Sequence, residues 1–121
     1  MALPTLVTAS GAGISAANGV YTICPAPNST FNGLNQYTNG TYFLDYNTTL
    51  SASAGAWEIS TVVNNPAANS GNANQVYQGP SDSARVFTYT GWTTPLGSTA
   101  PAPTFTAPAS APQNQPRVIV F

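Results

Sequence analysis

Few side chains in this sequence could carry chemistry. The 121-residue chain has three acidic residues, Asp45, Glu58 and Asp82, and two arginines, but no lysine and no histidine. Without histidine, the commonest general base is missing, and Ser-His and Cys-His nucleophile systems are impossible. A pair of carboxyl groups is the remaining catalytic option, because glycosidases use two acids on either side of the scissile bond.

Asp45 and Glu58 are the acids that could form such a pair. Each falls in a segment that alternates like a strand, residues 41–47 and 56–63, and each is expected on the outer face of its strand. We interpret both as solvated strand residues, because isolated acids are weak evidence for a site. Calcium binding by Asp45 or Asp82 with asparagine oxygens is chemically allowed, but no spacing matches a calcium loop. No metal or other cofactor is expected.

Aromatic residues make binding a stronger option than catalysis. Tyrosine and tryptophan faces beside asparagine and glutamine amides suit a glycan, and the chain has six tyrosines and two tryptophans. Alternatively, Trp57 and Trp92 anchor the core, and the tyrosines line a sheet with their hydroxyls reaching water. We favour the second interpretation, because a small β-domain needs large aromatic residues to build a core. Cys24, the only cysteine, is expected to be a buried or half-buried thiol.

The scarcity of charge argues against several partners. Charged residues make up 4% of this chain, against roughly 25% of an ordinary domain. Two distant arginines form no basic patch for nucleic acid or for an anionic membrane surface. No apolar run approaches the roughly 20 residues of a membrane-spanning helix, and the N-terminus lacks a signal-peptide pattern, so we expect a small gene product made in a cytosol. Weak repulsion between copies suits a fixed place in an assembly.

The backbone pattern predicts an all-β fold. Glycine, proline, asparagine and threonine are frequent, and no segment combines a 3.6-residue hydrophobic period with good helix formers. We expect a single small antiparallel β-sandwich or barrel of roughly six to eight short strands, with extended N- and C-terminal arms. The residues expected to hold the core are Trp57, Trp92, Tyr42, Tyr46 and Ile59.

Individual elements follow from alternation and turn residues. Residues 64–74 contain no large apolar side chain and are expected to form a surface loop. Residues 81–89 are ambiguous between a strand and one helical turn followed by a strand. The expected strands are residues 20–24, 41–47, 56–63, 75–79 and 103–107, with a weak strand within 31–37.

Both ends of the chain are expected to extend from the domain. We predict an N-terminal arm at 1–8, a β-domain at 9–107 and a proline-rich arm at 108–121, although residues 3–7 could also be a first strand. The consecutive β-prone residues 118–121 are an aggregation hazard unless paired, so we expect this arm to add a strand to an adjacent subunit. The expected partner-binding residues are Leu3, Leu6, Val7, Arg117, Val118, Ile119, Val120 and Phe121.

The order of several short motifs resembles a known family. The motifs are "SGAG" at 10–13, "NGVYT" at 18–22, "FNGLNQYTNGTYFLDYN" at 31–47, "AWEIS" at 56–60, "VYQGP" at 76–80, "GW" at 91–92 and "PAPT" at 101–104. Over residues 9–106 this order is similar to that of a small β-domain found in bacteriophage virion and tail-fibre-type proteins and in some cell-surface proteins. The resemblance implies a structural or adhesive module, not an enzyme.

The two arms suggest a separate virion component more than one bead of a long fibre. We therefore predict a structural component of a bacteriophage virion, a capsid decoration or cement protein. Its expected partners are the major capsid protein or neighbouring copies in a homo-oligomer. The alternative is a glycan-binding or host-adhesion module of a tail or fibre, and a hydrolase built on Asp45 and Glu58 is a distant third.

Overall fold

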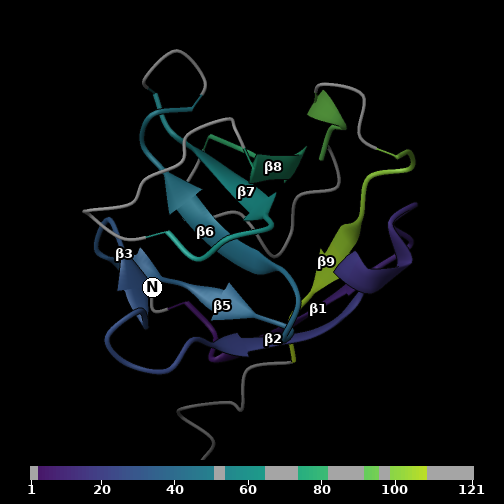
Figure 1. The fold of residues 1–121 in the computed structure, drawn as a ribbon. Coiled ribbons are helices and arrows are strands. Elements are labelled where there is room, and N and C mark those ends of the chain that lie inside the picture. The colour runs from purple at the N-terminus through teal and green to yellow at the C-terminus, as the bar shows by residue number, and fades with distance from the viewer. Residues whose placement is uncertain (1–2, 51–53, 65–73, 82–91, 96–98, 109–121) are drawn as a thin grey trace, which may run out of the picture.

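The computed structural model describes residues 3–50, 54–64, 74–81, 92–95 and 99–108 (Figure 1). Across these residues the chain forms nine strands and one short 3₁₀-helix, which confirms the predicted all-β class. The elements are β1 (Leu6–Ser10), η1 (Ser15–Ala17), β2 (Gly19–Ile23), β3 (Thr30–Phe31), β4 (Leu34–Asn35), β5 (Tyr37–Thr38), β6 (Phe43–Asn47), β7 (Ala56–Ser60), β8 (Gln75–Gln78) and β9 (Thr104–Thr106).

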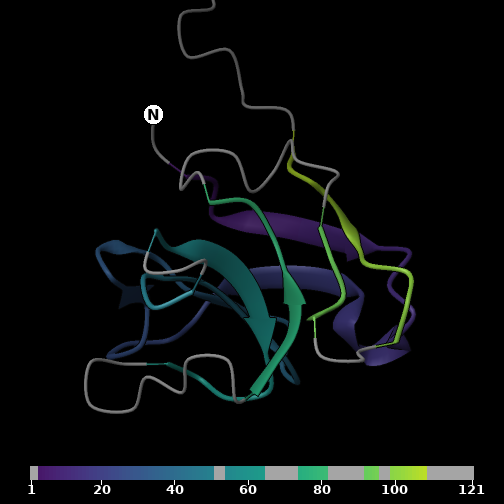
Figure 2. The same cartoon turned by 90° about the horizontal axis from the view of Figure 1, so that it is seen from above.

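Seven strands form one antiparallel sheet in the order β8-β7-β6-β5-β2-β1-β9, while β3 and β4 form a separate hairpin. Strands β5 to β8 follow one another as a meander, and β9 returns to pair with β1. The sheet is curled, and residues 92–95 run between β8 and β9 (Figure 2). Thr93 forms a bridge with Gln78 of β8, so this segment extends one end of the sheet toward the other.

The inner face of the sheet carries the hydrophobic core. Leu44 pairs with Ile59 and Tyr46 with Trp57 across β6 and β7, so both pairs point to the same side. Of the residues predicted to hold the core, Trp57 and Ile59 are fully buried and Trp92 is 6% exposed. Tyr42 and Tyr46 are half-buried and pack against the same cluster. The core prediction is therefore confirmed.

Three buried tyrosines use their hydroxyl groups inside the protein. The hydroxyl of Tyr21 donates to Ala17 O (2.8 Å), and that of Tyr37 donates to Pro4 O (2.7 Å). The hydroxyl of Tyr77 donates to Thr99 O (2.7 Å). The expectation that such hydroxyls reach water is wrong for these three, because backbone carbonyls of the connecting segments accept their protons. Each tyrosine ties a connection to the sheet.

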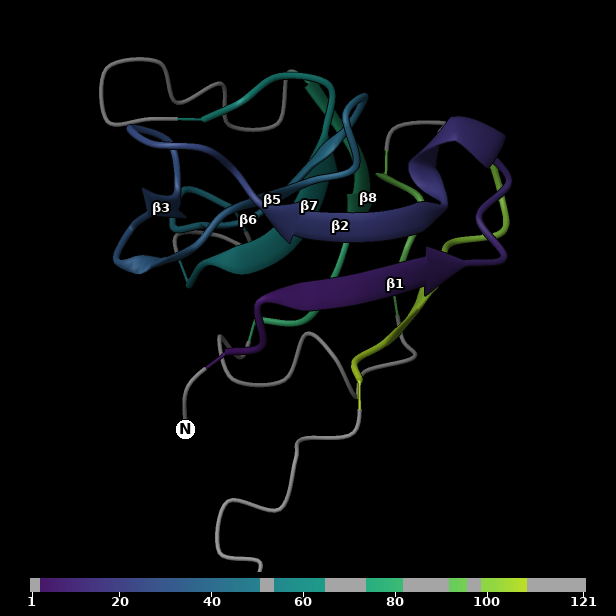
Figure 3. The same ribbon diagram turned by 90° about the horizontal axis from the view of Figure 1, so that it is seen from below.

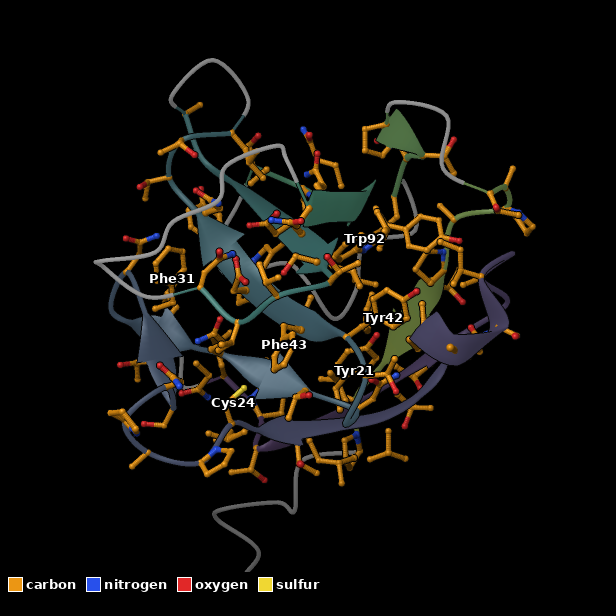
Figure 4. The ribbon with its side chains drawn as sticks, viewed as in Figure 1. Tyr21, Cys24, Phe31, Tyr42, Phe43 and Trp92 are labelled. Atoms are coloured by element: carbon orange, nitrogen blue, oxygen red, sulfur yellow. The ribbon has the colours of Figure 1, made fainter. Side chains whose placement is uncertain are left out.

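Side chains bring the two ends of the sheet together. The ring of Trp92, just beyond β8, packs on Phe105 of β9 with centroids 4.8 Å apart, and Phe105 meets Tyr21 edge-on at 6.1 Å. Figure 4 shows Trp92, Tyr42 and Tyr21 gathered between β6 and β9. Aromatic contacts therefore replace the backbone ladder that would close a regular barrel.

Residues 31–37 depart from the predicted single weak strand. Phe31 and Leu34 face each other across a two-residue turn, in which Asn32 (φ 54°) and Gly33 (φ 78°) are both left-handed. Asn-Gly is the preferred sequence for this kind of hairpin turn. The segment therefore forms β3 and β4, and the chain then enters the main sheet as β5.

The N-terminal boundary is also corrected. Leu6, Val7 and Thr8 belong to β1, which pairs with both β2 and β9, and Val7 is fully buried. The alternative of a first strand at residues 3–7 is right for Leu6 and Val7, and Val7 faces this chain's own core, where no partner can reach it. Leu3 is half-buried and packs on the core. The predicted arm residues Arg117, Val118, Ile119, Val120 and Phe121, like the predicted elements within 82–89, lie outside the described residues.

The packing of Trp92 on Phe105, which joins the two ends of the sheet, leads to a stability prediction. A Cβ atom added to Gly79 would lie 2.6 Å from Trp92 Cζ2, so Gly79→Ala must displace the indole that packs on Phe105. We expect a loss of about 1–3 kcal/mol in the free energy of unfolding, as for overpacked cores. Urea denaturation followed by tryptophan fluorescence measures it. Val20→Ala, at a residue that is 49% exposed, is the control and should change stability by less than about 0.5 kcal/mol. Equal stabilities of the two variants would contradict the packing argument.

Candidate functional site

The outer face of β6 and β7 is covered, contrary to the expectation of a wet face. All five residues of β7 are buried, so both of its faces are out of water. On the outer side lies a second layer that includes the buried residues Cys24, Phe31 and Asn64. Figure 4 shows Cys24 and Phe31 beside β5 and β6, away from the aromatic group around Trp92.

Asp45 and Glu58 meet within this covered layer. They are directly opposite each other in the register of β6 and β7, and both are fully buried. The prediction that they could be neighbours is confirmed, and the interpretation of both as solvated residues is wrong. Alternation along a strand identifies the face on which a side chain lies, but it does not show whether another segment covers that face.

Asparagine amides supply hydrogen bonds to the two carboxyl groups. Nδ2 of Asn47 donates to Glu58 Oε2 at 2.7 Å. Nδ2 of Asn64 lies 3.0 Å from Asp45 Oδ2 and 3.1 Å from Glu58 Oε2, so it bridges the pair. Oε2 of Glu58 therefore accepts two amide protons and Oδ2 of Asp45 accepts one, an arrangement that places the negative charge on Glu58.

Gln36 holds Asn64 in position. Its Oε1 accepts from the backbone N–H of Asn64 (3.1 Å), and its Nε2 donates to the carbonyl oxygens of Asn64 (3.0 Å) and Asn28 (2.9 Å). Gln36 and Asn64 are fully buried, so the prediction that the surface loop starts at residue 64 is wrong for Asn64. Buried amides of this kind position a donor with little freedom to move.

The two carboxyl oxygens that accept no amide proton indicate that Asp45 and Glu58 share one proton between them. Oδ1 of Asp45 and Oε1 of Glu58 are buried and receive no hydrogen bond from an N–H or O–H group of the described residues. Each carboxyl nevertheless lies within hydrogen-bonding reach of the other, which they can use only if one keeps its proton. Burial and the nearby Glu58 charge raise the pKa of Asp45 well above its usual range. Burial also raises the pKa of Glu58, against hydrogen bonds from Asp45, Asn47 and Asn64 that lower it.

This geometry does not favour hydrolysis. A catalytic carboxyl pair must touch a substrate and a water molecule, whereas both of these side chains have no exposed surface. The neighbouring thiol is also unreactive in character, because burial, with a smaller effect of the Asp45 charge, raises the pKa of Cys24 to about 11. Within the described residues, no group of three or more His, Cys, Asp or Glu side chains could hold a metal ion. No helix in the same residues is long and apolar enough to cross a membrane.

Most of the aromatic surface considered for glycan binding is used in the core. Tyr21, Tyr37, Tyr77 and Trp57 are fully buried. Tyr42 and Tyr46 are half-buried, and the Tyr46 hydroxyl donates to Ser81 O at 2.9 Å. The residues that form the carboxyl cluster, Gln36, Asn47 and Asn64, were not identified from the sequence. The alternation of side chains along β6 could have identified only Asn47, which lies two residues beyond Asp45 and therefore on the same face.

Comparison with known proteins adds no relative: no protein-family model matches this sequence, and neither the curated proteins nor the solved structures contain a match. The resemblance in motif order to phage β-domains therefore stays a hypothesis.

The buried pair makes stability depend on pH. In the unfolded chain both carboxyls ionise near about pH 4, whereas the folded pair keeps one proton, so stability is greatest in acid and falls as pH rises above about 4. One retained proton corresponds to a slope of at most about 1.4 kcal/mol per pH unit. Asp45→Asn replaces the retained proton with a permanent N–H donor. We expect this variant to be more stable than the natural chain near neutral pH and to lose less stability as pH rises between about 5 and 7.5, because only Glu58, whose pKa burial also raises, is left to titrate.

Thermal unfolding followed by circular dichroism over this pH range checks the expectation, and the absence of histidine leaves the window free of other side-chain titrations. Asp45→Leu is the matched contrast, because it removes the acid without supplying a donor to Glu58 or an acceptor to Asn64. It should be less stable than the natural chain at every pH. A natural chain and an Asp45→Asn variant with parallel pH profiles would mean that the pair holds no proton.

Proposed function

We propose that this chain is a structural component of a bacteriophage virion, a decoration or cement protein that binds the capsid or neighbouring copies. One observation supports a structural role above all: the described surface is uncharged. The chain has no lysine or histidine, and its two acids within the described residues, Asp45 and Glu58, are both buried. The other charged side chains, Asp82, Arg85 and Arg117, lie outside the described residues.

An uncharged surface suits permanent contact more than free solution. Proteins that stay dispersed at high concentration usually carry net charge, which keeps copies apart. Here the exposed groups are hydroxyls, amides and backbone atoms, with few apolar side chains such as Val20, which is 49% exposed. Contacts made by such groups depend on hydrogen bonds and apolar burial, which salt does not screen.

The phage setting comes from the order of sequence motifs, and the structural role fits the geometry of the carboxyl pair. Two buried acids that hydrogen-bond with asparagine side chains attach the segment at Asn64 to the sheet but cannot reach a substrate. A glycan-binding module is less well supported, because the aromatic rings that would stack on a sugar are largely inside the core. We therefore keep the decoration role ahead of the adhesion role.

The proposal predicts that the protein is found in purified phage particles and stays there at high salt. Mass spectrometry of particles made from the genome that carries this gene should detect the chain at a fixed copy number per capsid. Because the contacts are uncharged, washing in about 1 M NaCl should remove no more protein than washing in about 0.05 M.

A particle protein that the high-salt wash does remove gives the internal control for salt-sensitive binding. Particles that lack the chain, or that release it completely at high salt, would rule out the proposed role. Retention in tail fractions alone would favour the adhesion alternative.

A further inference from the structure

The chain has three Asn-Gly steps, at residues 18–19, 32–33 and 39–40. Asparagine before glycine is prone to spontaneous deamidation, because glycine has no Cβ to keep its backbone nitrogen away from the asparagine side chain. The three steps share the same two residue types, so a difference in their reactivity must come from the fold. It depends on what holds the amide of the asparagine and the N–H of the glycine.

The step at Asn18 is held by hydrogen bonds. Its Oδ1 accepts from the backbone N–H of Ala12 at 2.8 Å, and its Nδ2 donates to the carbonyl oxygen of the same residue at 3.2 Å. Gly19, the next residue, belongs to β2 and pairs with Ala9 of β1. The amide is therefore fixed at both of its polar atoms, and the glycine is part of the sheet.

The step at Asn39 is held by more hydrogen bonds. Oδ1 of Asn39 accepts from the backbone N–H groups of Thr41 at 3.0 Å and Tyr42 at 2.8 Å, in the turn before β6. The N–H of Gly40 donates to Oγ1 of Thr38 at 2.9 Å. Deamidation would have to break these bonds, because it needs the amide carbon and the glycine nitrogen to turn toward each other.

The step at Asn32 is different. Asn32 and Gly33 form the two-residue turn between β3 and β4, and both are exposed. Within the described residues the amide makes one hydrogen bond, from Nδ2 to the carbonyl oxygen of Tyr46 in β6 at 2.9 Å. We propose that Asn32 is the deamidation site of this chain, and that its modification detaches the β3–β4 hairpin from β6.

The reaction uses only water and base. The backbone nitrogen of Gly33 loses its proton to base and attacks Cγ of Asn32, and the new C–N bond closes a five-membered succinimide. Nδ2 leaves as ammonia after it takes a proton from water. Water then opens the ring at either carbonyl group and leaves aspartate or isoaspartate at position 32. In sum, water is consumed and ammonia is released, and the rate rises with pH because the attacking nitrogen must lose its proton.

The product changes the contact between the hairpin and the sheet. Figure 3 shows β3 beside β6, and Phe31 of β3 is buried in the outer layer. Nδ2 of Asn32 donates to Tyr46 O, whereas a carboxylate at this position can only accept, so the two oxygens repel each other. Isoaspartate also lengthens the backbone of a turn whose length sets the pairing of Phe31 with Leu34. The inference does not depend on the proposed function.

The first test follows deamidation of the full-length chain over time at mildly alkaline pH. Chymotrypsin cleaves after aromatic residues and places the three asparagines in separate peptides, which end at Tyr21, Tyr37 and Tyr42. Tandem mass spectrometry of these peptides should show conversion at Asn32 at least about tenfold faster than at the other two, which must first break hydrogen bonds. In concentrated urea the three rates should converge, because the fold no longer distinguishes them.

A rate at Asn18 or Asn39 that equals or exceeds the rate at Asn32 in the folded chain would overturn the assignment. The same holds for a difference that persists in urea, because it would come from the local sequence and not from the fold.

The second test measures detachment of the hairpin. Cys24 is the only cysteine and is buried in the same outer layer as Phe31, so the rate at which a thiol reagent labels it reports on the cover (Figure 4). Asn32→Asp supplies the aspartate product, which is ionised at neutral pH. Labelling of this variant should be about fivefold faster than labelling of the natural chain, the change that roughly 1 kcal/mol produces.

Asn32→Gly is the matched control, because it removes the hydrogen bond to Tyr46 without adding a charge and accepts the left-handed backbone of this position (φ 54°). Its labelling rate should fall between those of the natural chain and Asn32→Asp. Equal labelling of the natural chain and Asn32→Asp would mean that the hairpin stays on β6, and would overturn the second part of the proposal.

Discussion

The burial of two carboxyl groups between neighbouring strands is the constraint on which the outer layer of this structure depends. Asp45 and Glu58 have no access to water, so they cannot both carry a charge without a large desolvation cost. Sharing one proton removes half of that charge, and the amides of Asn47 and Asn64 offset the rest. Asn64 is held in place to bridge the two carboxyl groups because Gln36 hydrogen-bonds both its backbone N–H and its backbone carbonyl oxygen. The pair therefore requires that residues 24–36 and 61–64 be held against the sheet.

The sequence predicts the strands of the sheet better than it predicts the second layer that covers the outer face of β6 and β7. Alternation identifies β6 and β7 and puts Asp45 and Glu58 on the faces opposite Tyr46 and Trp57, whereas the register that pairs the two acids is given only by the structure. It could not show that the outer face is buried, because Asn64, which covers the two acids, is polar and comes from a segment that resembles a loop. Asn64 begins a run of asparagine, serine and glycine that has every compositional property of a surface turn. Its burial depends on tertiary hydrogen bonds, which no local pattern encodes.

The same limitation explains why the sequence could not decide between an N-terminal arm and a first strand. Residues 3–7 are too short and too weakly patterned to distinguish a free arm from a first strand, and the choice is decided by β9, which arrives nearly a hundred residues later to pair with β1. Long-range pairing of this kind carries the loop-closure cost that local propensity cannot represent. The aromatic core was easier to predict, because in a chain with so few large side chains the tryptophans have few other uses.

The two halves of the sheet differ in where the acidic residues lie on the outer face. Over β6 and β7 the outer face is closed by a polar layer that contains the only charged groups of the described residues. Over β2 and β9 the exposed side chains that the structure describes on the same face, Val20, Thr22, Thr104 and Thr106, are all uncharged. Placing the acids under a cover leaves the exposed half with no charge that would repel a second strand or a second sheet.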